Sequence, residues 1–439
     1  MDIRLNDYRP YGDGVNNDAE FINKAILDCH NGGGGFVHIT GVHKCGTIEI
    51  LDNVHLVVEK DAKIILSDNL DDFYDIKDDR DTQINRPTWE YCEYNGKPSK
   101  YFIYAKGKSN CGIVGDGIIN GNQEIFYGAI TKWHIEGAFY PRIPLIYFED
   151  CHEVTIKDIN LEKSAFWTVH LVGCSEVLIE SISINNDLRM VNSDGIDPDH
   201  CHNVIINNCK ISCADDCIVF KATDAFKEYG PCENIKVFNC ELTSTSAAIK
   251  FGTETTSDIN GIYISDCKIL NSNRGISFML RDEGNIHTIG FNNIHIETRR
   301  FSPLHWWGKA EPVAVTAVRR NENTKIGKIS NITFYNMTGV CENGVLLYGE
   351  DECNIDNLLF NNFKLELVNK TKWEKNIGID LRPSVYNIID GKIAVINAFN
   401  SKNIVFKDFE YNIDDDIRSY LDDEIVNVNS SIEINDVNC

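Results

Sequence analysis

Residues 262–269 read IYISDCKI, an apolar-x-apolar-x-polar-apolar-x-apolar phrase that recurs from the middle of the chain onward. Copies of the phrase begin at Val154, Val177, Val204, Ile235, Ile262, Ile289, Ile332, Leu358 and Ile404. The first five intervals are 23, 27, 31, 27 and 27 residues. Alternation with a period of two is the spacing of a β-strand, and a repeat of this length indicates a solenoid.

Two positions of the phrase predict how each copy folds. The fifth position holds a small polar residue, which suits a tight turn: Asp158, Ser181, Asn208, Asn239, Asp266, Asn293, Asn336, Asn362 and Asp408. The sixth position is apolar and is expected to face the core: Ile159, Ile182, Cys209, Cys240, Cys267, Ile294, Met337, Phe363 and Phe409. Because cysteine shares this position with isoleucine, we interpret most of the 16 cysteines as small buried residues.

Short strands with no helix inside the repeat predict an all-β chain folded as a parallel β-helix, with three strands and three turns in each coil. Leucine-rich repeats are disfavoured because their LxxLxL signature is absent. Residues 18–29, DAEFINKAILDC, predict an amphipathic helix that caps the first coil and ends at the glycines of 32–35.

The repeat predicts a single domain over residues 1–439. Within it we expect an N-terminal cap at about 1–50, catalytic coils at about 150–300 and an inserted loop at about 298–325. Insertions on a solenoid commonly form its binding face, so this loop is a candidate part of the site.

Charge and hydropathy limit the partners of the chain. A formal net charge of −24 disfavours binding to nucleic acid or to an anionic membrane surface. No apolar run is long enough to span a membrane, and the first residues, MDIRLNDYRP, lack the features of a secretory signal. We therefore expect a cytoplasmic protein.

Several segments resemble glycoside hydrolase family 28 of the pectin-lyase-like superfamily. YGDGVNNDAEFINKAI at 11–26 and IVGDGIING at 113–121 are similar to the first coils of that family. SDGIDPDHC at 193–201 and ADDCIVFK at 214–221 are similar to its Asn-Thr-Asp and Asp-Asp catalytic segments. The resemblance runs from about residue 8 to about 410. It implies a single-stranded, right-handed parallel β-helix that hydrolyses glycosidic bonds with inversion and without a cofactor.

Transferred to this sequence, the resemblance makes Asp194 and Asp216 the pair that activates water and Asp215 the general acid. The chemistry is consistent with these residue types, because inverting hydrolysis needs one protonated and one ionised carboxyl about 6.5–9.5 Å apart. Carboxylates on adjacent coils, whose strands are about 4.8 Å apart, can meet that requirement. They could also cap turns, as other polar corners of the repeat do.

Two segments depart from the family pattern. Ala247 stands where the histidine of a Gly-His-Gly segment is expected, and Ser277 and Met279 replace the Arg and Lys of an Arg-Ile-Lys segment. In polygalacturonases that Arg and Lys grip the carboxylate of a uronate. We therefore expect a specificity that differs from simple polygalacturonase activity.

The strands can be registered on Val169, Ile196, Ile218, Ile249 and Ile276, which sets up columns of stacked neighbours. The candidate substrate-binding residues on these columns are His170, Asp197, Lys221, Lys250, Glu254 and Arg281. The register predicts that Glu254 and Arg281 are neighbours, with Thr223 in the same column. The cations could replace the missing Arg and Lys, or they could neutralise acidic side chains within the fold.

The inserted segment FSPLHWWGKAEP at 301–312 adds further candidates. Trp306 and Trp307 could form a sugar-stacking platform or pack within the loop, and Glu311 is a weaker candidate for substrate contact. Together with residues at 71–100, this loop is expected to block one end of the groove. A blocked groove favours exo action.

No metal site is expected. Asp199, His200 and His202 resemble a metal cluster, but strand alternation sends neighbours to opposite faces. Cys209, Cys213 and Cys217 lack the second half of a zinc site.

The function predicted is an inverting, exo-acting glycosidase for pectin-derived or related acidic oligosaccharides. A polysaccharide lyase or epimerase on the same fold, or a non-catalytic glycan-binding β-helix, are the alternatives. The sequence does not specify an oligomeric state.

Overall fold

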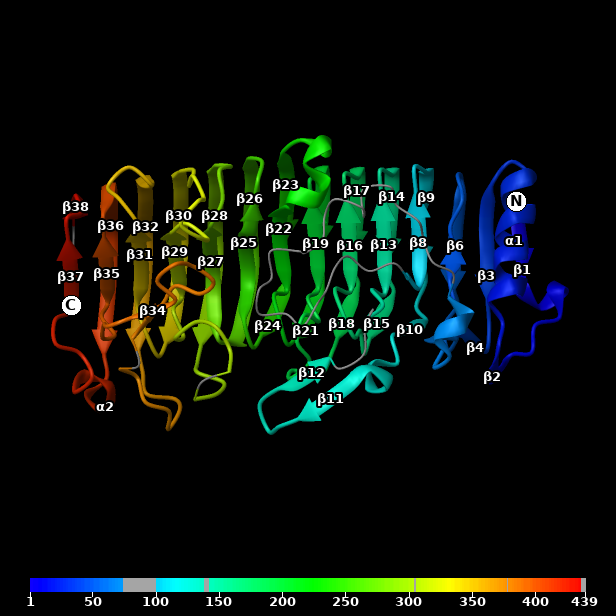
Figure 1. Cartoon of the computed structure of the whole chain (residues 1–439), viewed down its shortest axis with the longest axis horizontal. Helices are drawn as coiled ribbons and strands as arrows, with labels where there is room; N and C mark the ends of the chain where they lie inside the picture. Colours follow the sequence, from blue (N-terminus) through cyan, green and yellow to red (C-terminus); the bar gives the residue numbers. More distant parts are fainter. Residues whose placement is uncertain (74–99, 138–141, 304, 377, 436–439) are drawn as a thin grey trace. The chain divides into compact units, whose positions relative to one another are not determined.

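The computed structural model describes residues 1–73, 100–137, 142–303, 305–376 and 378–435. It divides into two compact units, Met1–Ala214 and Asp215–Cys439. Each unit is a stack of parallel strands (Figure 1), which confirms the parallel β-helix that the repeat predicts and that the resemblance makes right-handed. Most of the loop expected at 71–100 lies outside the described residues, and the single domain over 1–439 stays a prediction.

The first unit begins with β1 (Asp2–Arg4), β2 (Asp13–Asn17), α1 (Ala19–Asn31), β3 (Gly35–Ile39), β4 (Val42–Cys45), β5 (Ile48–Glu49), β6 (Val54–Val58) and β7 (Lys63–Leu66). It continues with β8 (Ile103–Lys106), β9 (Ser109–Val114), β10 (Ile118–Asn120), β11 (Tyr127–Ile130), β12 (Ile135–Gly137), β13 (Ile146–Glu149), β14 (His152–Lys157) and β15 (Asn160–Glu162). Its last coils are β16 (Val169–Val172), β17 (Ser175–Glu180), β18 (Ser183–Asn185), β19 (Ile196–Asp199), β20 (His202–Asn207) and β21 (Lys210–Cys213).

The second unit begins with β22 (Ile218–Ala222), β23 (Cys232–Phe238), β24 (Glu241–Ser244), β25 (Ala247–Thr255), β26 (Ile259–Ser272), β27 (Arg274–Leu280) and β28 (Ile286–Thr298). It continues with β29 (Val313–Ala317), β30 (Ile329–Cys341), β31 (Val345–Gly349), β32 (Ile355–Leu367), β33 (Ile379–Asp380) and β34 (Ile388–Ile389). It ends with β35 (Ile396–Phe399), β36 (Ser401–Ile413), α2 (Asp415–Arg418), β37 (Ile425–Val428) and β38 (Ile432–Asn435).

Three strands form each of the later coils of the first unit, as predicted: β13, β14 and β15 are followed by β16, β17 and β18 in matching register. In the second unit the second and third strands of a coil merge from β26 onward into single strands such as Ile259–Ser272 and Ile329–Cys341. The predicted corner then lies inside a longer strand.

The polar corners have the backbone conformation that a tight turn requires. All nine fifth-position residues have positive φ, for example 60° at Asp158, 58° at Asn239 and 49° at Asp408. Asn and Asp tolerate this left-handed conformation better than other residues with a Cβ. The apolar residue after each corner is buried in every copy. Both predictions from the repeat are therefore confirmed.

Aromatic stacks fill the interior of the second unit. The rings of Phe251 and Phe278 are stacked with centroids 4.3 Å apart, and those of Phe334 and Phe360 with centroids 4.4 Å apart. The same position on successive coils holds the same residue type, so each ring lies on the ring below it. These stacks fix the register of the strands that carry polar residues on their outer side.

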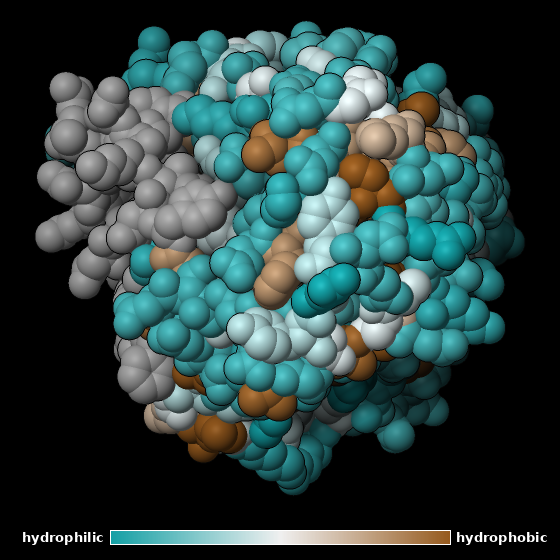
Figure 2. Space-filling view, turned by 90° about the vertical axis from the view of Figure 1, so that its right-hand side faces the viewer, coloured by the Kyte–Doolittle hydropathy of each residue, from teal (hydrophilic) through white to brown (hydrophobic). Residues whose placement is uncertain are grey.

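Helix α1 packs on β1, β3, β5 and β6 and covers the N-terminal end of the first unit. Its buried residues include Ile22, Ala25 and Ile26, as the amphipathic pattern predicts, and the helix ends at Gly32. The surface at this end is mainly hydrophilic (Figure 2). No helix among the described residues has the length and apolar character needed to cross a membrane.

The interpretation of the cysteines is also supported. Of the 14 described cysteines, 13 are buried, and all 14 are free thiols. Burial is the main cause that raises the pKa of Cys341 to about 12. These thiols pack as apolar groups.

Candidate active site

The first unit positions Asp194, His170 and Asp197 on one series of strands. Val169 pairs with Ile196 and His170 pairs with Asp197, which confirms the predicted register between β16 and β19. Asp194 lies two residues before β19 and is buried. Tyr147 precedes His170 in the same row, and sequence reasoning gave it no role.

His170 is surrounded by partners within this unit. Its Nε2 lies 3.3 Å from Asp199 Oδ2, and its ring makes edge contacts with Trp167 and Tyr147 at centroid distances of 4.6 and 5.2 Å. Asp197 and Asp199 are fully buried. The surroundings give His170 a role in fixing the fold, and its contact with substrate stays a prediction, as does that of Asp197.

The second unit positions Asp215 and Asp216 just before β22. Ile218 pairs with Ile249, and Ile249 pairs with Ile276, so the predicted register is confirmed here as well. Asp216 lies two residues before Ile218, which is the position that Asp194 occupies relative to Ile196 in its own coil. The same side-chain type thus stands at the same point of two coils.

Asp216 is held by three donors. The ammonium of Lys250 lies 2.5 Å from Oδ2, while the Ser246 hydroxyl and the Ala247 backbone N–H donate to Oδ1 at 3.0 and 3.2 Å. The Asp216 side chain is 1% exposed and that of Lys250 is 8% exposed. A buried ammonium partner stabilises the ionised carboxylate, as a base requires.

Asp215 stands next to Asp216 in the chain but in a different environment. Its side chain is partly exposed, and its backbone carbonyl accepts a hydrogen bond of 2.5 Å from the Ser244 hydroxyl. Two neighbouring carboxyl groups whose surroundings differ in this way are suited to different roles as acid and base.

The three candidate cations, Lys221, Lys250 and Arg281, are buried. Lys250 is committed to Asp216, and Lys221 is buried on β22. Arg281 is fully buried. Its guanidinium donates to the backbone carbonyls of Leu280 on its own strand and of Thr316, Leu381 and Pro383 on segments far along the chain. This burial argues against the predicted substrate contact of Arg281, which instead ties together separate parts of the second unit.

One predicted column is wrong. A register shift between Phe220 and Ala222 pairs Ala222 with Thr255, so Thr223 does not fall in line with Glu254. The extra residues in β25 are the physical reason, because they form an irregularity that simple counting along a strand does not include. Glu254 is buried, and its contact with substrate stays a prediction.

The segment around Glu254 is anchored by an ion pair that the sequence did not indicate. Arg320 donates to both oxygens of Asp282, at 2.9 and 2.8 Å, and to the Thr253 carbonyl at 3.1 Å. Asp282 also accepts the Thr255 backbone N–H at 3.0 Å. The residues on both sides of Glu254 are therefore fixed.

The three candidate residues of the inserted loop differ in exposure. Trp306 is buried, Trp307 is partly exposed, and Glu311 is 1% exposed. Glu311 accepts two hydrogen bonds from Arg274, at 3.0 and 3.1 Å. This pairing argues against a direct contact of Glu311 with substrate.

A hairpin that the sequence did not predict covers the outer side of later strands. β33 and β34 pair antiparallel, and Ile379 and Leu381 pack with Ala314, Val318 and Leu346 in one hydrophobic cluster. Ala314 and Leu346 are paired neighbours on β29 and β31. The outer face of these two strands is therefore occupied by the protein itself.

The two histidines of the segment at 199–202 differ in exposure. His200 is buried, with its Nε2 3.8 Å from Asp199 Oδ1, whereas His202 is exposed. His200 lies in the turn between β19 and β20, where its φ is 54°, and His202 begins β20.

Comparison with known proteins places these features in a family. The model of glycosyl hydrolases family 28 matches residues 55–381. A probable polygalacturonase of Vitis vinifera is 26% identical over 289 residues, which cover 62% of this chain and 55% of the length of the grape protein. An endo-polygalacturonase of Pectobacterium parmentieri is 23% identical over 373 residues, covering 82% of this chain and 86% of that protein.

A solved structure agrees with the fold. The exopolygalacturonase of Thermotoga maritima matches with a TM-score of 0.68 and 19% identity, over 84% of this chain and 87% of that one. At this level of identity the match concerns the fold alone.

Proposed function

Because the chain belongs to glycosyl hydrolases family 28, and is therefore a glycosidase, we propose that it hydrolyses pectin-derived acidic glycans with inversion, from a chain end. The observation that carries the proposal is the contrast between Asp216, buried and paired with Lys250, and the partly exposed Asp215 beside it. An inverting glycosidase needs one ionised and one protonated carboxyl. We assign the role of base to Asp216 and the role of acid to Asp215.

In this mechanism Asp216 activates the water that attacks the anomeric carbon, and the part that the resemblance gives Asp194 in this step stays a prediction. Asp215 donates a proton to the leaving oxygen, for which its partial exposure gives access to the bond. Asp216 takes up the proton that this water loses, and the ion pair with Lys250 holds its carboxylate in position. The product first released has the opposite anomeric configuration to the substrate.

The hairpin of β33 and β34 supports cleavage at a chain end. It covers the outer face of β29 and β31 with the side chains of Ile379 and Leu381. A glycan lying along the outer face of β22, β25 and β27 would meet this hairpin on the next strands. A glycan that cannot extend past the hairpin is bound by its end, which is the binding geometry of an exo-acting enzyme.

The names of the relatives support galacturonate as the sugar, since the grape and bacterial proteins are called polygalacturonases. Ser277 and Met279 are both buried in β27 and lack the charge of the Arg and Lys that polygalacturonases carry there. We therefore assign the class, an acidic pectic glycan, and expect its carboxylates to be bound differently from those in simple polygalacturonases.

The test is hydrolysis of polygalacturonate, trigalacturonate and rhamnogalacturonan by the wild type and by Asp215→Asn, with the first anomer followed by NMR. A matched control is Asp224→Asn, which changes an acid of the same unit that is 53% exposed and lies 3.1 Å from Lys227 on its own helix. Small inverted products that disappear in Asp215→Asn, and persist in the control, are expected.

Three results would contradict the proposal. Retained configuration would contradict inversion, and long products at early times would contradict chain-end cleavage. An unsaturated uronate product, detected by ultraviolet absorbance, would show a lyase instead.

A further inference from the structure

The two neighbouring tryptophans of the inserted loop differ in what they can contact. Trp306 is buried, with 9% of its surface exposed, whereas Trp307 is partly exposed. A tryptophan combines a large apolar face with few rotatable bonds, so it can bind a flat ligand surface at low entropic cost. Whether Trp307 can bind a sugar depends on how rigidly its loop backbone is held and on how close it lies to the candidate catalytic residues.

The backbone around Trp307 is held by side chains of three different segments. Asn273 Nδ2 donates to the Trp307 carbonyl at 2.7 Å, and the Gly308 N–H donates to Asp380 Oδ2 at 2.9 Å. The Lys309 N–H donates to Glu311 Oε2 at 2.7 Å. Three consecutive residues of the loop are thus fixed by side chains that are themselves buried.

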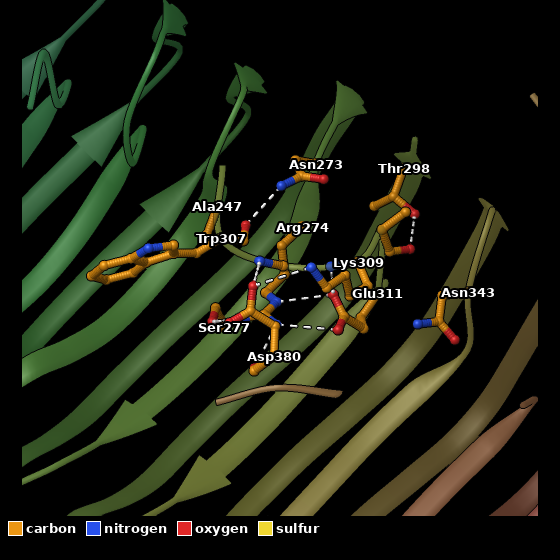
Figure 3. A network of polar contacts seen from close by, with 12 residues as sticks. Ala247, Asn273, Arg274, Ser277, Thr298, Trp307, Lys309, Glu311, Asn343 and Asp380 are labelled. Carbon is orange, nitrogen blue, oxygen red and sulfur yellow. Dashed lines mark hydrogen bonds and ion pairs between the residues drawn. The ribbon is translucent and has the colours of Figure 1, made fainter. Parts of the chain in front are cut away.

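Arg274 is the centre of this arrangement. Its Nε and Nη2 donate to the two oxygens of Glu311, and Nη2 also lies 3.4 Å from the Asp380 carbonyl oxygen. Figure 3 shows these charged side chains gathered together, while the indole of Trp307 points away from them. The network therefore holds the loop on the side away from the indole (Figure 3).

Gly308 allows the loop to approach Arg274. Its φ is +98°, and a Cβ at this position would lie 3.1 Å from Arg274 Nε and 3.3 Å from Cζ. A side chain here would strain the backbone and push the loop away from the guanidinium. The close contact of loop and arginine depends on this glycine.

The network also locates Trp307 relative to the candidate base. Arg274 pairs in register with Ala247 on the neighbouring strand, and the Ala247 N–H donates to Asp216 Oδ1. Trp307 is bonded to Asn273, the residue before Arg274. One strand pairing therefore separates the segment that holds Trp307 from the segment that holds Asp216.

We propose that Trp307 forms the stacking wall of the sugar subsite beside Asp216, and that Arg274, Glu311 and Asp380 are positioning residues for it. The apolar C–H face of a pyranose ring would lie on the indole, as flat apolar groups lie on aromatic side chains in other binding sites. The proposal rests on the proposed function and adds the residue that grips the sugar. It also separates Trp307 from Trp306 and Glu311, which the sequence grouped together.

The first test is steady-state hydrolysis of trigalacturonate by Trp307→Ala, Trp307→Phe and Trp306→Phe. We expect Trp307→Ala to raise KM about 10- to 100-fold, the range given by the loss of one aromatic stacking contact, with kcat within about threefold. Trp307→Phe keeps an aromatic face and should stay within about fivefold of the wild-type KM. Trp306→Phe, the matched control, should leave KM unchanged.

A binding measurement supplies a readout besides turnover. Trigalacturonate added to Asp215→Asn should change the tryptophan emission, and the change should be lost in Asp215→Asn combined with Trp307→Phe. An equal emission change in both proteins, or an unchanged KM in Trp307→Ala, overturns the stacking role.

The positioning role is tested with Gly308→Ala and Asp380→Asn. Both should raise KM toward the value of Trp307→Ala, and adding Trp307→Ala to either should have little further effect. Thermal unfolding checks that each variant is folded. If Asp380→Asn does not fold, Gly308→Ala alone tests the positioning role. Full additivity of the two substitutions would contradict the positioning role.

The outcomes separate this inference from the proposed function. If the wild type hydrolyses trigalacturonate and Trp307→Ala has the same KM, the sugar subsite at Trp307 is overturned and the proposed function is not affected. A wild type that neither binds nor cleaves any galacturonide overturns the proposed substrate, and with it the sugar assigned to Trp307.

Discussion

The ammonium of Lys250 lies 2.5 Å from the carboxylate of Asp216, and both side chains are buried. The sequence left open whether Lys250 binds a substrate carboxylate or neutralises an aspartate of the protein, and the structure pairs it with Asp216. An ion pair taken out of water is stable only when both members are present, because either one alone is an uncompensated charge.

Removing the lysine is expected to act on the chemical step. Lys250→Met should lower kcat roughly 100-fold, the scale of an impaired acid–base group, with KM changed by less than about threefold. Lys250→Arg should recover part of the loss because it retains the charge. Steady-state kinetics on trigalacturonate measure both. A raised KM at unchanged kcat would instead restore the predicted contact with substrate.

The two adjacent aspartates should differ in their effect on stability. Asp216→Asn leaves Lys250 buried without its carboxylate and should lower the free energy of unfolding by about 3–5 kcal/mol. Asp215→Asn changes a partly exposed group and should stay within about 0.5 kcal/mol of the wild type. Urea unfolding of both variants is the measurement. Equal losses would mean that Lys250 is not the main partner of Asp216.

Asp380 should make the stability of the second unit depend on pH. Burial alone would raise its pKa, but Arg382, together with Lys309 and Arg274, holds the pKa of Asp380 well below its usual range. Because the folded-state pKa is depressed, this carboxylate contributes stability above its unfolded pKa of about 3.9, and the contribution is lost as the pH falls toward the folded value.

Comparison of the wild type with Asp380→Asn tests that dependence. The difference in unfolding free energy should be largest near neutral pH and should shrink as the pH is lowered below about 4. Asp68→Asn, in which an exposed aspartate 2.8 Å from Lys44 is changed, should show a small difference throughout. A difference in unfolding free energy between the wild type and Asp380→Asn that grows as the pH falls would contradict a depressed pKa of Asp380.

Loosening the covering hairpin should alter the products. Leu381 is fully buried in the cluster that holds the hairpin, so Leu381→Ala should cost about 2–5 kcal/mol and expose the outer face of β29 and β31. We expect longer products from polygalacturonate at early times, measured by chromatography. Leu365→Ala, at a buried position of β32, is the matched control and should lose stability without a change of products.

The repeat could be predicted from sequence because each coil carries the same local signal. Asn208 and Asp266 have positive φ at the predicted corners, and the residues after them are buried. The pairing of Ile249 with Ile276 follows from the same alternation. Local turn chemistry and period-two burial determine these features, so one sequence is sufficient to find them.

The polar network could not be predicted in the same way. Arg274 and Arg281 are long, charged residues on a strand, and sequence reasoning places such residues on the surface or against substrate. Their partners lie far along the chain: Glu311 for Arg274, and the carbonyls of Leu381 and Pro383 for Arg281. Only the return of the chain over its own coils, which no local pattern signals, brings these groups together.

The buried thiols make the folded and unfolded chains chemically different. In the fold, Cys341 and its neighbours in the core are kept from oxidants, and burial raises the pKa of the Cys341 thiol to about 12. Each molecule that unfolds exposes many ordinary thiols at once, which can form random disulfides faster than the coils re-form. In air, unfolding then becomes a one-way loss. The working life of the enzyme outside a reducing solution is set by its rate of unfolding, and an added thiol reductant should prolong it.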